Sequence, residues 1–400
     1  MSDANTRRLR TAKSDFPISQ NAPEPTVSQA GSRTTKIEVG YAFSSPIFIK
    51  TKGIRTTNVR VSKAADTRRG GSVHVEVLVS SLSTTIHSRV HTKSLVNEQN
   101  ECELCVEVDW SVWDIGLTNA EVSITLPMSS DEPSVHPGIR VDIPSGALGV
   151  TMMGSTRFKA LDLSTGHGPA HLSDVGMDSL RLVAHNGNIT LHDIEATGTV
   201  DITGKAAWMD IDDLHAETLI ATSTDAIISL KDIQAHSVCA TTTNARIGLG
   251  NVKADVLEAS TCNGEVVAGN VFADVCNVKV EKGDIEGNWS PRKKLYLSTS
   301  NAKIASQVHL PAESSVEMVF TSKNGPIQLD LPAAFEGGFS LQTTGINKTF
   351  IHTARDANIN PVLHISRPEH KTGMLGNDSK RHSLRVITEE APITVNFGSL

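Results

Sequence analysis

The chain has 400 residues, of which 38% are hydrophobic and 20% charged, as in ordinary soluble proteins with a large core. Its net charge of -7 argues against nucleic acid or an anionic membrane as a direct partner, because both attract basic surfaces. No apolar run is long enough to insert into a membrane, and the N-terminus lacks the hydrophobic stretch of a secretion signal, so the sequence predicts a cytoplasmic location.

The first part of the chain divides into a tail and a β-rich region. Residues 1–35 are polar and contain three prolines, which predicts a disordered tail. From residue 36 to 157, alternating segments such as NVRVSK and SVHVEVLVS are separated by Gly, Pro and charged turns, as is typical of strands. We expect this region to cap the domain that follows, since an open sheet end exposes unpaired strand edges.

The five cysteines are an odd number, which favours free thiols over a disulfide framework. Cys102 and Cys105 form a CxxC motif in the segment CELCVEVDW, which alternates like a strand. Residues three apart on a strand point to opposite faces, so we do not expect these two thiols to converge on a metal ion.

A pattern of nineteen residues recurs nine times between Ala160 and Leu331, within a domain that we place at residues 158–331. Its ninth position is always Gly or Ala: Gly168, Gly187, Ala207, Ala226, Ala245, Gly264, Gly283, Ala302 and Gly325. The spacing changes only by one residue near Gly198 and four near Ser314, insertions that a repeat array tolerates in its loops. The period indicates stacked, equivalent coils.

The apolar positions of each unit change parity three times. In one unit they are Val200 and Ile202, then Met209 and Ile211, then Leu214 and Ala216. A strand cannot change which side chains face inward without a bend, and the unit is too short for a strand and a crossover helix. The sequence therefore predicts an all-β fold, a parallel three-sided β-solenoid of about nine to ten coils.

In the C-terminal part, residues 332–400, the apolar pattern of the repeat returns only near the end. Leu384, Val386, Ile393 and Val395 occupy apolar positions of a unit, after a stretch rich in Gly, Lys and His. We expect an irregular C-terminal coil and cap, with a mobile loop at residues 366–383.

An aspartate column is the first candidate site. The fifteenth position is Asp174, Asp193, Asp213 and Asp232 in four successive units, and then Asn251 and Asn270. Carboxylates about 5 Å apart repel by about 1 kcal/mol in water, and by more at a partly buried corner. Two hypotheses remain: each side chain accepts a backbone hydrogen bond at the bend, or two adjacent Asp residues, with Asp212 or carbonyl oxygens, bind Ca²⁺. No other cofactor is expected.

Two polar columns are expected to be structural. The eighth position carries Asn186, Asn244, Asn263, Asn301 and Asn324, which suit a turn and can bond to one another along the stack. The fifth position is Ser or Thr in most units: Thr203, Thr222, Thr241, Ser260, Ser298 and Thr321. We expect an outward hydroxyl ladder.

An enzyme is the alternative class, because parallel β-solenoids include polysaccharide lyases and hydrolases. The segment Gly166-His167-Gly168 and the carboxylates of Asp210, Asp212 and Asp213 are the candidate motifs. Only 4% of the residues are aromatic, few for a sugar-cleaving site. Of the array's two tryptophans, Trp208 is expected to face outward and Trp289 to stand where Asp or Asn is usual.

The segments TSNAKI, TSKNGPI, AHNGNITL and TCNGEVV, after a β-rich region ending in SITLP and GIRVDIP, resemble the putative adhesin family over roughly residues 57–397. The resemblance implies a β-solenoid domain of unknown function, found in bacteria and fungi, and no catalytic residues. Its members are often membrane-anchored or surface-exposed. We therefore predict a non-enzymatic, adhesin-like interaction or scaffold protein with a protein or glycan partner.

Overall fold

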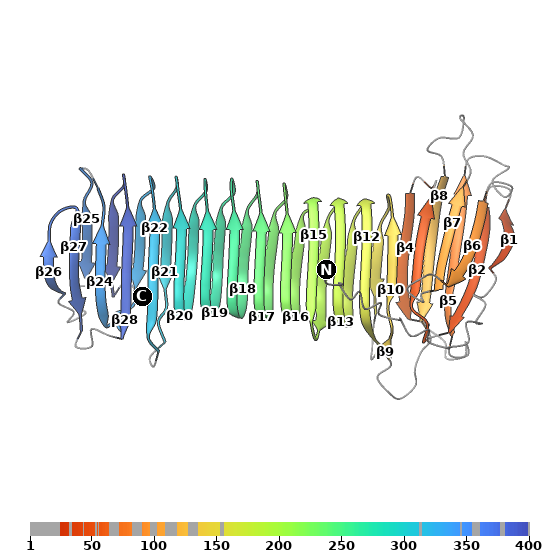
Figure 1. Ribbon diagram of the computed structural model, residues 1–400, viewed down its shortest axis with the longest axis horizontal. Helices are drawn as coiled ribbons and strands as arrows, with labels where there is room; N and C mark the ends of the chain where they lie inside the picture. Colours follow the sequence, from red (N-terminus) through yellow and green to blue (C-terminus); the bar gives the residue numbers. More distant parts are fainter. Residues whose placement is uncertain are drawn as a thin grey trace, which may run out of the picture.

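The computed structural model describes residues 25–31, 34–42, 44–52, 54, 56–63, 72–81, 90–96, 102–108, 118–126, 135–152, 156–311, 314–344, 346–353, 361–376 and 381–398. These residues form one 29-stranded sheet that winds into a long rod (Figure 1). The described chain is all-β, as predicted, and none of its segments is a helix that could span a membrane.

The strands fall into three regions along the chain. The N-terminal region contains β1 (Thr26–Gly31), β2 (Thr34–Ala42), β3 (Ile47–Lys52), β4 (Thr56–Lys63), β5 (Ser72–Ser81), β6 (Val90–Val96), β7 (Cys102–Val108), β8 (Thr118–Leu126), β9 (Val135–His136), β10 (Ile139–Ile143) and β11 (Leu148–Thr151). The repeat array contains β12 (Arg157–His167), β13 (Ala170–Asn186), β14 (Ile189–Ala196), β15 (Thr199–Ala206), β16 (Met209–Ser223), β17 (Ile228–Thr242), β18 (Ile247–Thr261), β19 (Val266–Val280), β20 (Ile285–Thr299), β21 (Ile304–Val308), β22 (Val316–Ser322) and β23 (Ile327–Leu331). The C-terminal region contains β24 (Gly337–Gln342), β25 (Thr349–Thr353), β26 (Val362–Ser366), β27 (His370–Leu375), β28 (His382–Thr388) and β29 (Ile393–Phe397).

The coils of the array stack in register, as the nineteen-residue period predicts. Met209 of β16 pairs with Ile228 of β17, which pairs with Ile247 of β18, and every neighbouring position follows the same offset. All of these pairings are parallel. Residues at equivalent positions therefore form columns along the rod, about 4.8 Å apart.

Each coil has three faces, which we name by the residues of β16. The first face is Met209–Asp212, the second Asp213–Ala216 and the third Thr218–Ser223, followed by a tight turn. Buried residues change parity at each boundary, because the chain bends there. This confirms the three-sided solenoid.

The core is a stack of aliphatic columns. One column on the third face contains Leu180, Val200, Leu219, Val238, Leu257, Cys276 and Leu295, each at most 2% exposed. Burying such a side chain stabilises the fold by about 1.5–3 kcal/mol. Desolvation raises the pKa of the Cys276 thiol to about 12, so this cysteine packs as a small hydrophobic residue.

The sequence prediction for Trp289 is wrong. Trp289 is fully buried and pairs with Val271 in an inward column, because β20 shifts register before and after this residue. In the neighbouring inward column, Ala268, Gly287 and Ser306 follow one another where earlier coils have Leu or Ile. These small residues offset the volume of the indole in the core.

The N-terminal region is β-rich, and part of it continues the solenoid. β3 pairs in parallel with β7 on one side and with β10 on the other, and β4 lies in the same way between β8 and β11. Antiparallel strands β1, β2, β5 and β6 close this end of the rod. The end of the stack is thus covered by a change from parallel to antiparallel pairing.

The tail expected at residues 1–35 differs from the structure at its end. Residues 26–31 form β1, in which Val27 pairs with Ile37 of the adjacent strand β2, so pairing with a neighbouring strand overrides the polar composition of this segment. Residues 1–24 lie outside the described part of the chain.

The last coil in the sequence is not the last in space. β28 lies between β22 and β24 and pairs in parallel with both, and β29 lies likewise between β23 and β25 (Figure 1). The apolar residues that recover the repeat pattern, Leu384 and Val386, are buried as predicted. The C-terminal segment is therefore a coil inserted between two earlier ones.

Part of the loop expected at residues 366–383 is a strand, and residues 377–380 lie outside the described part of the chain. Residues 370–375 form β27, which pairs antiparallel with both β24 and β26. The glycine that suggested a loop, Gly373, has a packing role, since a Cβ there would lie 2.7 Å from the Phe339 ring. Glycine marks close approach here rather than flexibility.

His136 is a buried titratable group at the junction between the N-terminal region and the array. Its side chain is fully buried, its Nδ1 accepts a hydrogen bond from the backbone N–H of Gly138 at 3.1 Å, and its ring packs edge-on against Phe158. Desolvation lowers its pKa to about 4. The folded protein therefore favours the neutral imidazole.

We predict that this histidine makes the fold less stable in mild acid. The unfolded imidazole takes up a proton at a pKa of about 6.5, so stability falls as the pH drops from 6.5 towards 4, by about 2 kcal/mol at pH 5. Thermal unfolding at pH 7 and pH 5 measures this loss. His136→Asn keeps an acceptor for Gly138 but does not titrate, so its melting temperature should fall less between the two pH values.

His364 is the matched control, because this histidine is exposed on β26. His364→Asn should keep the full difference between pH 7 and pH 5. An equal pH dependence in the wild type and in His136→Asn would contradict the assignment to His136.

Candidate binding surface

The aspartate column lies at the corner between the first and second faces. Asp174, Asp193, Asp213 and Asp232 all have left-handed backbones, with φ of 56°, 55°, 51° and 49°. Their side chains are exposed, so the expected partly buried corner is not found. Asp and Asn tolerate this conformation better than other residues that carry a Cβ. The column therefore makes the bend in four successive coils.

Among the residues that the structure describes, no group of three His, Cys, Asp or Glu ligands includes these carboxylates. Within the described ranges, the one group of three potential metal ligands within 4.8 Å of one another is Glu38, His74 and Glu76. One member of the column is bonded to an amide of the next coil, since Asn251 Nδ2 donates a hydrogen bond to Asp232 Oδ1 at 2.8 Å. Calcium binding by the column stays a prediction.

The group on β2 and β5 already contains a cation. Lys36 Nζ lies 2.8 Å from Glu76 and 2.9 Å from Glu38, and these two carboxylates raise the pKa of the lysine. Glu38 and Glu76 are direct cross-strand partners, an arrangement that repels unless a positive charge lies between them. The ammonium group of Lys36 supplies that charge.

The candidate enzyme motifs do not come together. Asp210 and Asp212 lie on the first face, where Lys231 Nζ is 3.2 Å from Asp210 and His192 is 3.8 Å from Asp212. His167 ends the third face of an earlier coil, and its Nδ1 lies 3.1 Å from Asn186 Nδ2. The histidine and the carboxylates thus occupy different corners.

The polar ladders form as predicted. Amides bond along the rod from Asn263 to Asn244 at 2.7 Å and from Asn324 to Asn301 at 2.6 Å. Hydroxyls bond between Thr241 and Ser260 at 3.3 Å and from Thr321 to Ser298 at 2.8 Å. These side chains bond to one another, which indicates a structural role.

The CxxC segment is a strand, as predicted, with Cys102 against the core and Cys105 on the other side.

A concave surface runs along the second face, and we call it the side groove. It consists of two adjoining hollows of about 470 and 380 Å³ that share Gln234, Ala235 and Asp255. Together they extend from the coil of β14 to that of β20. The groove therefore runs along the rod rather than across it.

The side groove exists because one column is made of alanine. Ala196, Ala216, Ala235 and Ala254 line the hollows at equivalent positions of successive coils. The same column has the larger Phe158 and Met177 on the N-terminal side and Pro291 on the C-terminal side. The small side chains leave a depression where the larger ones would fill it.

Polar side chains of both signs line the walls. His236 Nδ1 lies 2.6 Å from Asp255 Oδ2, and Lys253 and Arg292 border the second hollow. Phe272 stands in the same hollow and is 43% exposed. The groove thus offers hydrogen-bond donors, acceptors and one aromatic face.

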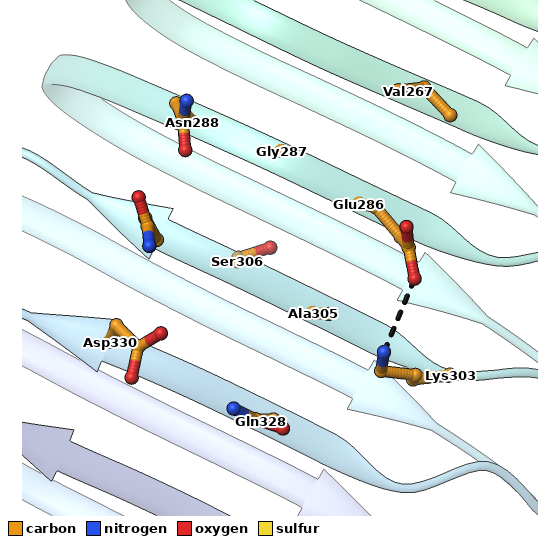
Figure 2. Close-up of a pocket in the computed structure, with 10 residues that line it drawn as sticks. Val267, Glu286, Gly287, Asn288, Lys303, Ala305, Ser306, Gln328 and Asp330 are labelled. Carbon is orange, nitrogen blue, oxygen red and sulfur yellow. Dashed lines mark hydrogen bonds and ion pairs between the residues drawn. The ribbon is translucent and has the colours of Figure 1, made fainter.

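A third hollow, of about 360 Å³ and separate from the side groove, lies on the first face. Figure 2 shows Glu286 and Lys303 paired at one end, at 3.2 Å, and Asn288 and Asp330 at the other. Gly287 lies between these two polar ends. Asp330 already accepts a hydrogen bond from Asn396 at 2.7 Å, so part of this surface is satisfied internally.

Neither the side groove nor the hollow on the first face was predicted from the sequence. The available signal was a run of small residues at one position of the repeat: alanine on the second face, and Ala268, Gly287 and Ser306 on the first. Small residues are also common in well-packed cores, so the run gains meaning only when the faces are known.

Residues 84–247 match the profile of a protein family described as Toastrack DUF4097. This match and the stacked parallel coils confirm the resemblance to a putative adhesin family with a β-solenoid domain. No curated protein matches the chain.

Among solved structures, a putative adhesin from Parabacteroides distasonis is 10% identical, with 90% of this chain and 97% of that chain covered and a TM-score of 0.31. A putative adhesin from Bacteroides fragilis is 10% identical, with 90% and 96% covered and a TM-score of 0.27. A putative cell adhesion protein from Clostridium sporogenes is 9% identical, with 94% and 100% covered and a TM-score of 0.16. Similarity at this level carries no argument about function.

We predict that the corner aspartates tolerate glycine but not β-branched residues. Asp213→Val should destabilise the protein by about 1–2 kcal/mol, because a Cβ-branched residue is strained at a φ of 51°. Asp213→Gly should be close to the wild type. Thermal unfolding followed by circular dichroism measures both.

Asp210→Val on the flat part of the same coil is the control, since valine suits an extended strand. Equal stability of Asp213→Val and Asp210→Val would show that the corner conformation is not required. The same scans with calcium and with a chelator test the calcium hypothesis, which predicts a higher melting temperature with the ion.

Proposed function

We propose that the protein is a non-enzymatic, adhesin-like binding protein whose side groove holds an extended, neutral glycan chain. The observation that carries the proposal is the continuity of the groove, which spans the coils from β14 to β20 and is lined by equivalent residues at each step. A repetitive groove suits a repetitive ligand, since each coil can offer similar contacts to each unit of the chain.

Spacing supports a polymer that lies parallel to the rod. Adjacent coils are separated by about 4.8 Å, close to the advance of one sugar unit in an extended glycan. The alanine floor gives room for a chain one sugar ring wide, while Gln234 and Lys253 project from successive coils beside it. A peptide strand would change its side chain direction at every residue and match this period less well.

The chemistry of the walls supports a neutral ligand. The side groove is lined by two cationic side chains, Lys253 and Arg292, and by two carboxylates, Glu217 and Asp255, so its formal charges balance. Charges that neutralise one another favour neither a polyanion nor a polycation. Amide, imidazole and carboxylate groups bind hydroxyls, and the exposed face of Phe272 suits the apolar side of a sugar ring.

A non-catalytic role is supported by the interactions of the carboxylates in and near the groove. Cleavage of a glycosidic bond needs two carboxyl groups on opposite sides of the bond, one of them protonated. The side groove is lined by two carboxylates, Glu217 and Asp255, and Asp255 is engaged by His236 at 2.6 Å instead. Asp210, one of the candidate catalytic carboxylates, is paired with Lys231 on the first face.

The proposal predicts that removal of the aromatic face weakens glycan binding. Phe272→Ala should lower the affinity for neutral oligosaccharides about tenfold, which corresponds to 1.4 kcal/mol. Titration calorimetry with oligosaccharides of increasing length measures the affinity. It should rise with length until the chain fills the groove and then stay constant.

Trp208→Ala is the matched control, because Trp208 is a similarly exposed aromatic residue outside the groove. It should bind as the wild type does. Equal binding by Phe272→Ala and the wild type would remove the groove from the proposal. New reducing ends or unsaturated sugars in the mixtures would favour the alternative, a polysaccharide-cleaving enzyme.

A further inference from the structure

Exposed apolar residues gather at the C-terminal end of the rod. Eleven large hydrophobic side chains are exposed in the described part of the chain. Five of them fall within one short segment: Ile346, Phe350, Val362, Leu363 and Ile365. Single exposed hydrophobic residues need no explanation, but such a concentration marks an interaction site.

Three of these residues belong to β26, a strand at the edge of the sheet. All five residues of β26 are exposed, and within the described residues β27 is the one strand that pairs with it. The segment Val362–Ser366 contains no Asp, Glu, Lys or Arg and no proline. It therefore lacks the charges and the proline with which soluble proteins block edge strands.

We propose that the C-terminal end binds a second copy of this chain through β26, in antiparallel pairing about a two-fold axis. An edge strand is complementary to its own two-fold copy, because the backbone groups of one strand face those of the other in antiparallel order. Two copies that each carry a net charge of -7 repel each other, and a strand without charged residues, such as β26, is a place where contact costs little.

The sequence of β26 sets the register of this pairing. With His364 on the two-fold axis, Leu363 of one copy lies opposite Ile365 of the other, and the reverse pair forms on the far side of the axis. Pro361 and Pro368 flank the strand, so pairing cannot extend beyond it. The contact closes as a dimer and does not propagate into a fibre.

The pairing is short, and this determines its strength. β26 has five residues, and its register with β27 shifts between Leu363 and Ile365, so the regular edge is limited. An interface of this length is smaller than the standard size for tight complexes. We therefore expect a dissociation constant of about 1 to 100 μM.

Dimerisation would join two rods end to end. The two side grooves would then lie on one elongated particle and could bind a surface bivalently. The dimer does not depend on the proposed glycan binding, because β26 shares no residue with the groove.

Sedimentation velocity of the full chain over the micromolar range tests the proposal. The wild type should shift from monomer to dimer with concentration, and the double variant Leu363→Lys and Ile365→Lys should stay monomeric across the range. Both side chains are exposed, so unchanged circular dichroism and melting temperature are expected.

Val27→Lys is the matched control, since Val27 is 51% exposed on β1 at the opposite end of the rod. It should dimerise as the wild type does. His364→Cys should form a disulfide between the two copies on mild oxidation, mapped by mass spectrometry. A wild type that is monomeric throughout, or a β26 double variant that still dimerises, would overturn the proposal.

Discussion

In-register stacking of parallel coils is the interaction on which the other features depend. Because nineteen residues complete one turn, each side chain in β16–β19 lies over its own equivalent in the next coil. A side chain is therefore compatible with the stack only if it can lie about 4.8 Å from the equivalent side chains of the neighbouring coils. Aliphatic residues, amides and hydroxyls meet this condition, since they pack or bond with their own kind.

Charged side chains at equivalent positions repel one another, and the array reduces this repulsion in two ways. One is alternation, as where Asp162 lies between Arg140 and Arg181, 3.5 and 3.7 Å from them in successive coils. The other is exposure, as in the aspartate column, where water screens the repulsion and the left-handed bend selects the residue type. A column of carboxylates is thus explained by backbone geometry without a bound ion.

The same constraint explains how much the sequence could predict. Period, bends, amide ladders and the inward places of Leu384 and Val386 are properties of columns, and equivalent positions can be compared along a single sequence. What failed depends on neighbours that the period does not specify. Trp289 is buried because β20 shifts register around it. Residues 370–375 form the strand β27 because they pair with β24 and because Gly373 packs against Phe339.

The side groove shows how such a fold acquires a specific surface. The repeat keeps the backbone constant, so a depression arises only where a column changes in size, as from Met177 to Ala196 and from Ala273 to Pro291. The candidate binding residues are therefore departures from neighbouring coils, such as Phe272 after Lys253. Function in this molecule is found where the repeat varies, whereas the repeated residues maintain the rod.

The two ends of the rod stop the addition of further parallel coils in different ways. A parallel stack can keep adding coils, so each end needs a change in strand direction. At the N-terminal end, four antiparallel strands provide it. At the C-terminal end, β28 holds β24 in parallel on one side while β27 runs antiparallel on the other, so a further parallel coil cannot follow. Within the described residues, β25 and β26 each pair with one strand, and β26 is the one of the two whose residues are all exposed. The two-fold copy of such an edge strand is antiparallel by symmetry. The device that stops growth of the solenoid thus leaves an edge suited to a closed pair.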